Sequence, residues 1–183
     1  GRLEQRGRPP PLSAETGGMK AMSVGASALT EQGVVEIVAS ALGSAGRRCS
    51  ALRLLCIQDE VADHTLKMLR GAMAECRMGN PGRLSTDVGP VIDAAARQRV
   101  LAAAAGGRVL TGAEIIGDDG YFVRPTIVDQ APDDHLLARD EVFGPIALLQ
   151  PVDSVAAAVE RANGVDYGLA AAVYTNDLAA AMS

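Results

Sequence analysis

The chain has 183 residues, of which 48% are hydrophobic and 21% charged, as in an ordinary globular protein with a hydrophobic core. The net charge of −5 argues against nucleic acid as a partner, and no apolar run is long enough for membrane insertion. Three cysteines without regular spacing favour a reducing compartment, and two isolated histidines, His64 and His135, make no metal site, so we expect a cytoplasmic protein without a metal.

Both ends of the chain indicate a piece of a longer protein. Residues 1–11 are basic and rich in proline, which predicts a disordered or extended segment before one domain over residues 12–183. Gly1 is not an initiator methionine, and residues 176–183 have the pattern of the first turns of a helix. We therefore expect this domain to be incomplete at its C-terminus.

Strands alternate with helices along the predicted domain. The predicted strands cover residues 12–14, 21–24, 54–57, 108–110, 121–123, 126–128, 146–149 and 169–174. The predicted helices cover residues 27–42, a segment that Asp59 caps and that runs to about 76, an alanine-rich segment that Asp93 caps, and residues 153–163. This alternation predicts an α/β fold with a largely parallel sheet flanked by helices.

Hydrophobic spacing also assigns several side chains to the core. Cys56 lies in a continuous apolar run typical of a strand that is covered on both faces. Cys76 continues the apolar face of the second helix, and Val155 and Val159 mark the packed face of the last one. We therefore expect Cys56 and Cys76 to pack rather than to react.

The segment Ser44–Arg53, between a predicted helix and a buried strand, is the strongest candidate for chemistry. Gly46 allows a tight turn before Cys49, and small residues on both sides leave room above the sulfur. Arg47 and Arg48 beside Cys49 favour the thiolate, which is the nucleophilic form of the side chain. The alternative is a small buried residue at the end of a helix, because most free cysteines are buried and unreactive.

Two other segments carry carboxylates near glycines. Glu15 precedes Gly17 and Gly18, and Glu141 lies two residues before Phe143 in the segment Asp140–Pro145. A thiolate that attacks an aldehyde forms a thiohemiacetal able to expel hydride, and the resulting thioester needs water activated by a base. The residues alone also allow a solvated Glu15, an ion pair of Glu141 with Arg139, and a core role for Phe143.

Together, these three segments resemble the signature segments of the aldehyde dehydrogenase superfamily. In that superfamily Glu-x-Gly-Gly carries the general base, Gly-x-x-Cys carries the nucleophile, and Glu-x-Phe-Gly-Pro contacts the nicotinamide ribose and ring. The resemblance implies Cys49 as nucleophile, Glu15 as base, and Glu141 and Phe143 as ligands of NAD or NADP. The backbone N–H of Cys49 is then one oxyanion donor.

Residues 14–18, 44–46, 49–53 and 84–93 are similar to the L-glutamate γ-semialdehyde (1-pyrroline-5-carboxylate) dehydrogenase part of bifunctional proline utilization A. This similarity implies NAD-dependent oxidation of L-glutamate γ-semialdehyde to L-glutamate in proline catabolism. It also implies that Ser50 contacts the small aldehyde substrate, and that the full-length parent is a homo-oligomer. Arg53 belongs to the same motif, although a surface or structural ion pair explains it equally well.

The sequence departs from this pattern in two places, and part of the family's machinery has no counterpart. Arg47 stands where the family has glutamine, and Met19-Lys20 stand where the subfamily has Gln-Asn. The cofactor-binding domain precedes Glu-x-Gly-Gly in the family, so we expect the isolated chain to be inactive with NAD. Three alternatives remain: another aldehyde dehydrogenase, a cofactor-free thiol esterase, and a non-catalytic assembly module.

Overall fold

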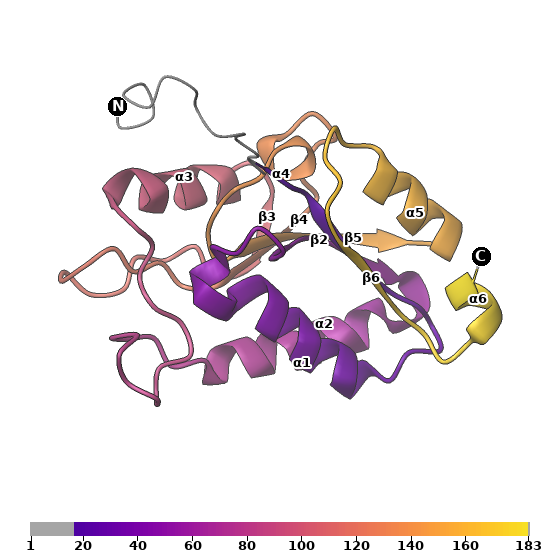
Figure 1. Ribbon diagram of the computed structural model, residues 1–183, viewed down its shortest axis with the longest axis horizontal. Helices are drawn as coiled ribbons and strands as arrows, with labels where there is room; N and C mark the ends of the chain where they lie inside the picture. The colour runs from indigo at the N-terminus through magenta and orange to yellow at the C-terminus, as the bar shows by residue number, and fades with distance from the viewer. Residues whose placement is uncertain (1–16, 183) are drawn as a thin grey trace, which may run out of the picture.

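A six-stranded sheet with helices on both faces is built from residues 17–182, which are the residues that the computed structural model describes (Figure 1). Its strands are β1 (Lys20–Val24), β2 (Leu52–Gln58), β3 (Arg108–Thr111), β4 (Thr126–Asp129), β5 (Ile146–Val152) and β6 (Ala171–Tyr174). Its helices are α1 (Thr30–Leu42), α2 (Asp59–Glu75), α3 (Ala94–Ala104), α4 (Leu136–Arg139), α5 (Val155–Asn163) and α6 (Leu178–Met182), with a 3-10 turn, η2, over Gly43–Gly46.

The order of the strands confirms the predicted, largely parallel α/β sheet. Along the sheet the order is β3-β4-β5-β2-β1-β6, and every neighbouring pair is parallel except β3 and β4. Helices α1 and α2 cover one face, and α3, α4 and α5 cover the other (Figure 1). Each face is therefore shielded from water, which suits the continuous apolar runs of the central strands.

Strand β2 shows how the core is divided between the two faces. Leu55 and Ile57 pack toward α1 and α2, whereas Leu54 and Cys56 pack toward the opposite face, as the two-residue period of a strand requires. The neighbouring parallel strand β5 alternates in the same way. Cys56 is 1% exposed, which confirms its predicted place in the core.

Side chains cap the starts of several helices, and the sequence predicts the cap of α3. Asp93 accepts a hydrogen bond from the Ala96 N–H and begins α3. Ser154 does the same for Ala157 at the start of α5. The predicted cap at Asp59 is wrong, because Asp59 is the first residue of α2 and makes no side-chain capping bond. Asp59 instead places a negative charge in the first turn, where the helix dipole favours it.

Two other local predictions are also wrong. Residues 121–123 form no strand, since only Val123 pairs, in a single bridge with Ile115, before Pro125 removes a donor. In α5 the buried residue is Ala158, whereas Val159 is 49% exposed. The helix rotates its small residues toward the sheet, because alanines let it approach more closely. The predictions for residues 1–11 and 12–14 lie outside the described residues.

The three candidate segments meet because of where the parallel strands begin. The glycine pair 17–18 leads into β1, the cysteine segment leads into β2, and the segment Asp140–Pro145 leads into β5. Strands β1, β2 and β5 are adjacent and parallel, so their starting ends share one edge of the sheet. Topology alone therefore brings segments more than 120 residues apart in sequence into contact: the Gly18 N–H donates to the Glu141 carboxylate across 123 positions.

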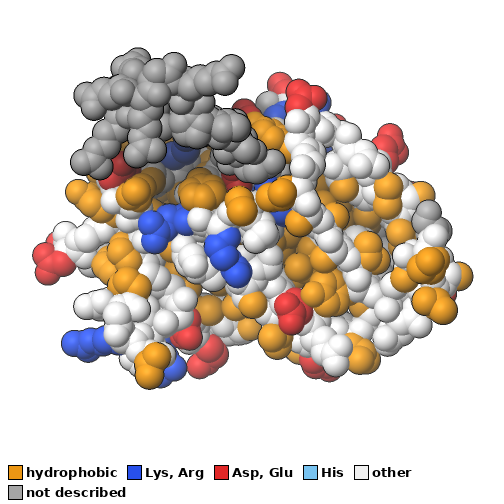
Figure 2. Space-filling model, viewed as in Figure 1, with side chains coloured by type: hydrophobic (Ala, Val, Ile, Leu, Met, Phe, Trp, Pro, Cys, Tyr) orange, Lys and Arg blue, Asp and Glu red, His pale blue; other side chains and the backbone are white. Residues whose placement is uncertain are grey.

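The edge of the sheet that β6 forms, together with α6, exposes apolar side chains. Strand β6 is an edge strand, and Figure 2 shows hydrophobic side chains gathered over β6 and α6. Leu178 and Met182 of α6 are 77% and 79% exposed. Among residues 17–182, no helix has both the length and the hydrophobicity to cross a bilayer, and no group of three His, Cys, Asp or Glu side chains is placed to hold a metal.

Candidate active site

A strained backbone turn presents the candidate nucleophile. Ser44, Ala45 and Gly46 are consecutive residues with φ of 57°, 54° and 64°, in the left-handed region. For a residue other than glycine this conformation costs about 1–2 kcal/mol. At Gly46 there is a second reason for glycine, because a Cβ there would lie 2.1 Å from the Gly144 carbonyl oxygen. The turn is therefore packed directly against the segment that contains Glu141.

Cys49 follows this turn and is exposed, so the alternative of a small buried residue is wrong. Its backbone N–H makes no hydrogen bond with any residue between 17 and 182. An exposed sulfur with a free N–H beside it is the arrangement that an attacking thiolate and an oxyanion acceptor need. Ser50, the next residue, is exposed as well.

The two arginines before Cys49 bind backbone carbonyls. Arg47 Nε donates to the Ser44 carbonyl at 3.3 Å, and Arg48 Nη2 donates to the Ala39 carbonyl at 2.7 Å. Ala39 lies in the last turn of α1, where carbonyl groups lack helical partners and favour a cation. Both guanidinium groups thus help to close the turn that ends α1.

Arg53, which the sequence left between two roles, links all the parts of the site. Its side chain is 3% exposed and donates to the Gly46 carbonyl through Nη2 and to the Gly144 carbonyl through Nη1 at 2.9 Å. The guanidinium also lies 5.7 Å from the ring centroid of Phe143, in cation–π contact, and 3.7 Å from Glu141. Burial lowers the pKa of Arg53 to about 10, although the nearby Glu141 opposes this shift.

Glu141 is held in place through both of its carboxylate oxygens. Its Oε2 accepts the Gly18 N–H at 3.2 Å, and its ion pair is with Arg53, so the predicted alternative pair with Arg139 is wrong. Arg139 instead donates to backbone carbonyls of Asp133 and Gly164. Glu141 Oε1 is buried without a hydrogen-bond donor among the described residues. This oxygen faces Arg53 Nη2 at 3.7 Å, beyond hydrogen-bond distance, so it retains acceptor capacity.

Cys49, Glu141 and Phe143 line one cavity of about 480 Å³, together with Gly17 and three residues that the sequence did not single out. These three are Arg99, Asp140 and Tyr167. The Tyr167 hydroxyl donates to Asp140 at 2.8 Å, and this bond raises the pKa of Tyr167. Asp140 precedes Glu141 in the segment Asp140–Pro145, but no sequence spacing connects Tyr167 or Arg99 to this segment.

Glu15, the predicted base, lies outside the described residues, so its place relative to Cys49 stays a prediction. Gly17, two residues later, does line the Cys49 cavity. Its Cα approaches the Tyr167 ring, since a Cβ on Gly17 would lie 2.7 Å from Cε1 of that ring. The described part of the Glu-x-Gly-Gly segment therefore reaches the site.

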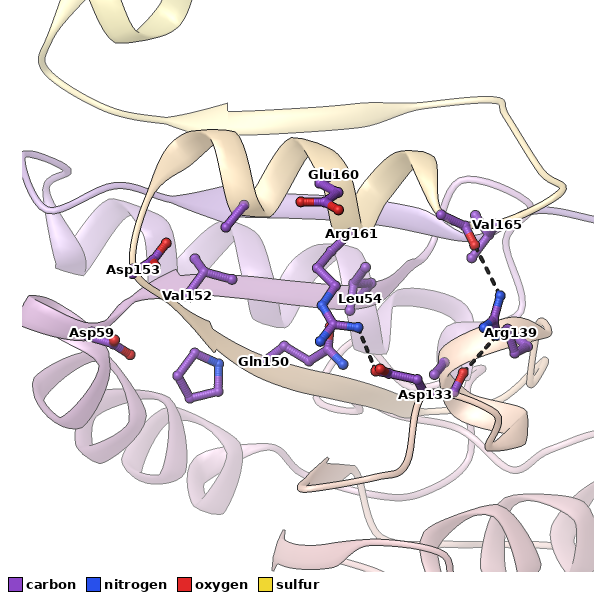
Figure 3. Close-up of a pocket in the computed structure, with 14 residues that line it drawn as sticks. Leu54, Asp59, Asp133, Arg139, Gln150, Val152, Asp153, Glu160, Arg161 and Val165 are labelled. Carbon is purple, nitrogen blue, oxygen red and sulfur yellow. Dashed lines mark hydrogen bonds and ion pairs between the residues drawn. The ribbon is translucent and has the colours of Figure 1, made fainter.

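A larger cavity of about 730 Å³ lies between α5, α4 and the end of β5, and it shares no residue with the Cys49 cavity (Figure 3). Its arginines already have partners. Arg161 of α5 pairs with Asp133, and Arg139 donates to the Asp133 and Gly164 carbonyls. With its cations engaged in this way and no thiol in its lining, this cavity carries none of the chemistry that the motifs predict.

Comparison with known proteins defines the class. Residues 3–183 match the aldehyde dehydrogenase family. The chain therefore belongs to the aldehyde dehydrogenase family. Among solved structures, it superimposes on a 1-pyrroline-5-carboxylate dehydrogenase from Thermus with bound NAD, with a TM-score of 0.86 and 29% identity over 92% of this chain and 33% of that one. Lactaldehyde dehydrogenase from Escherichia coli gives the same TM-score at 31% identity, covering 92% of this chain and 36% of that one.

The curated relatives are longer than this chain. It is 50% identical over 187 residues to the bifunctional protein PutA of Escherichia coli strain K12, covering 95% of this chain and 14% of PutA. It is 38% identical over 170 residues to a 1-pyrroline-5-carboxylate dehydrogenase of Bacillus cereus strain B4264, covering 90% of this chain and 33% of that enzyme. The chain thus spans about a seventh of the one and a third of the other.

Proposed function

We propose that this chain is the nucleophile-bearing part of an NAD-dependent aldehyde dehydrogenase that oxidises L-glutamate γ-semialdehyde to L-glutamate. The observation that carries the proposal is the shared cavity of Cys49 and Glu141, in which the cysteine is exposed and one carboxylate oxygen lacks a donor. The names of PutA and of 1-pyrroline-5-carboxylate dehydrogenase support the substrate. The domain over residues 12–183 would then be the catalytic one.

In the proposed reaction, the Cys49 thiolate attacks the aldehyde carbon and its own N–H stabilises the oxyanion. Loss of hydride from the thiohemiacetal leaves a thioester on Cys49. Glu15 takes a proton from water, which attacks the thioester and releases the carboxylate and the thiol. Ser50, beside the nucleophile, would contact the substrate. A positioned base of this kind contributes about 10²- to 10⁴-fold to a rate.

The residues present fit the nicotinamide half of the cofactor. Glu141 lines the cavity and its Oε1 accepts no hydrogen bond among the described residues, so this carboxylate could accept one from a ribose hydroxyl, and Phe143 lines the same cavity and is 43% exposed. When bound, NAD or NADP supplies the hydride acceptor. Arg53 would orient Glu141 for this contact, because it pairs with the Glu141 carboxylate and donates to the carbonyl of Gly144 in the same segment.

The remaining parts of the proposal concern the whole protein. A homo-oligomeric parent is supported by the exposed apolar side chains over β6 and α6, and a cytoplasmic location of that parent is part of the proposal. An assembly role of α6 is compatible with catalysis, because α6 follows the C-terminal end of β6, whereas the Cys49 cavity lies at the starting ends of the parallel strands β1, β2 and β5.

The test is aldehyde-dependent reduction of NAD in the longer protein that carries this chain. We expect Cys49→Ser to abolish reduction with L-glutamate γ-semialdehyde, and Glu15→Gln to lower it at least a hundredfold. Cys76→Ser is the matched control, because Cys76 lies away from the cavity and bonds the Ala72 carbonyl. Full activity of Cys49→Ser would refute the proposal. Ester hydrolysis that needs Cys49 without any NAD reduction would favour the thiol esterase.

A further inference from the structure

Tyr167 brings a fourth chain segment to the edge of the sheet where the nucleophile lies. It belongs to the connection between α5 and β6, four residues before β6 begins. Strand β6 runs parallel to β1, so its starting end lies at the same edge as the starting ends of β1, β2 and β5. The sequence motifs account for the other three segments, whereas they assign no role to Tyr167.

The two ends of the Tyr167 side chain contact two different segments of the site. The ring lies against Gly17, since the three heavy atoms nearest to a Cβ on Gly17 would be Cε1, Cδ1 and Cζ of this ring, at 2.7, 3.3 and 3.7 Å. The hydroxyl donates to Asp140 Oδ1 at 2.8 Å, and Asp140 directly precedes Glu141. Tyr167 therefore limits the space at position 17 and is fixed to the segment of Glu141 at the same time.

The same two segments are joined again one residue further along each. The Gly18 N–H donates to Glu141 Oε2 at 3.2 Å, directly after the contact of Gly17 with the Tyr167 ring. Each glycine is thus held by one contact, the first by Tyr167 and the second by Glu141. The glycine pair leads into β1, so these contacts determine how the chain enters the sheet beside the nucleophile cavity.

Neighbouring contacts keep Tyr167 in this place. Arg139 Nη1 donates to the Gly164 carbonyl at 3.4 Å, which ties the connection after α5 to the residue before Asp140. The hydrogen bond to Asp140 is the largest of several effects that raise the pKa of Tyr167, so the hydroxyl stays protonated and remains a donor at neutral pH. A bond from a hydroxyl to a carboxylate is stronger than one between neutral groups, which suits a fixed support.

We propose that Tyr167 is a positioning residue that holds Gly17 in place and thereby sets the position of the base segment relative to the nucleophile. This inference rests on the proposed function and deepens it, since Glu15 is joined to Gly17 through a single residue. Loss of the ring frees Gly17, whereas Glu141 keeps its ion pair with Arg53. The loss should therefore affect hydrolysis of the thioester, which needs the base, more than the attack and the loss of hydride that precede it.

The structural test is hydrogen exchange of the Gly18 amide, followed by NMR in the chain itself. We expect Tyr167→Ala to speed this exchange about tenfold, and Tyr167→Phe to keep most of the protection because the ring remains. Tyr121→Ala is the matched control, since the Tyr121 ring contacts Arg97 and does not line the Cys49 cavity. Unchanged exchange in Tyr167→Ala would overturn the proposal, and so would an equal acceleration in the core strand β2, which would show a general loss of stability.

Gly17→Ala tests the same contact from the other partner. A methyl group at this position would displace the Tyr167 ring, so Gly17→Ala should speed exchange of the Gly18 amide about as much as Tyr167→Ala does. The double variant should exchange no faster than the faster single variant, because the contact is already lost. Independent, additive effects of the two changes would overturn the proposal.

Kinetics in the longer protein provide the functional test. Reduction of NAD in the first turnover reports attack and loss of hydride, whereas the steady-state rate also includes hydrolysis of the thioester. We expect Tyr167→Ala to lower the steady-state rate about tenfold to a hundredfold and to keep the first-turnover rate within about threefold, with Tyr167→Phe recovering most of the loss. Glu15→Gln is the reference, because it removes the proposed base outright and should divide the two rates in the same way.

Equal losses in the two rates of Tyr167→Ala, or no loss in either, would overturn the proposal. If the proposed function itself fails, neither the unmodified protein nor any variant reduces NAD with the aldehyde. Exchange of the Gly18 amide still reports on Tyr167 in that case, so the two failures are distinguishable.

Discussion

Arg53 and Glu141 form an ion pair at 3.7 Å in which only 3% and 13% of the two side chains are exposed. The same guanidinium donates to the carbonyls of Gly46 and Gly144. One residue therefore fixes the turn before the nucleophile, the segment after Glu141, and the carboxylate proposed to bind the cofactor. Burial of the guanidinium has the largest influence on the Arg53 pKa and lowers it. Because this desolvation offsets the attraction to Glu141, the ion pair positions the two side chains more than it stabilises the fold.

Removing Arg53 should destabilise the domain, because it leaves Glu141 as an uncompensated, largely buried charge. For Arg53→Met we expect a loss of about 3–5 kcal/mol in the free energy of unfolding, measured by urea denaturation. The control is Arg83→Met, an exposed arginine without a side-chain partner among residues 17–182, which should change stability by less than about 0.5 kcal/mol. Adding Glu141→Gln to Arg53→Met should recover part of the loss. Equal stability of the two arginine variants would contradict the linking role of Arg53.

Two glycines provide a matched pair for testing the nucleophile turn. Gly46 has φ of +64° and no room for a Cβ beside the Gly144 oxygen, whereas nothing lies within 4 Å of a Cβ on Gly71 in α2. Gly71→Ala should therefore stabilise the domain by about 0.5–1 kcal/mol through helix propensity. Gly46→Ala should destabilise it by more than about 2 kcal/mol, and it should also slow alkylation of Cys49. A neutral Gly46→Ala would mean that the turn relaxes freely and does not preorganise the sulfur.

Sequence reasoning singled out Cys49, Glu141 and Phe143, and the structure places all three around one cavity. They meet because each lies in a short motif that immediately precedes a parallel strand, and adjacent parallel strands bring such motifs together. The alternation of strands and helices likewise fixed the fold class. Local periodicity was sufficient for the fold class, whereas the candidate site residues came from the resemblance to the family's signature segments.

What sequence reasoning missed depends on contacts between distant segments. For Arg53 the sequence offered a surface or structural ion pair, and the structure shows a buried pair with Glu141, but its bond to the Gly144 carbonyl, 91 positions away, was not predictable. Tyr167 joins the site through Asp140, 27 positions earlier, and no motif spacing contains that distance. The left-handed Ser44 and Ala45 were also unpredictable, because neither residue favours that conformation. Such features are imposed by packing rather than by local preference.

The three cysteines should differ sharply in reactivity. Cys49 is exposed, whereas burial raises the pKa of Cys56 from 9.0 to about 11 and also raises the pKa of Cys76. This shift alone lowers the thiolate fraction of Cys56 about a hundredfold near pH 8, and burial hinders access further. We expect iodoacetamide at pH 8 to label Cys49 first, then Cys76, and Cys56 last, with each site read by peptide mass. Equal rates at all three sites would show that the domain opens faster than it reacts.

The raised pKa of Cys56 also makes a prediction for stability against pH. Because the pKa is higher in the folded chain, about 11, than the ordinary 9.0, the folded state retains a proton that the unfolded state loses. This contribution to the free energy of unfolding is fully present below pH 9 and is lost as the pH rises through 11. The loss amounts to about 2 kcal/mol at pH 10.5. Urea denaturation of the unmodified chain and of Cys56→Ala at pH 7.5 and 10.5 measures it, since other titrating groups affect both alike. Cys56→Ala should lose about 2 kcal/mol less between the two pH values, and identical losses would mean that the Cys56 thiol ionises in the folded chain as it does in the unfolded one.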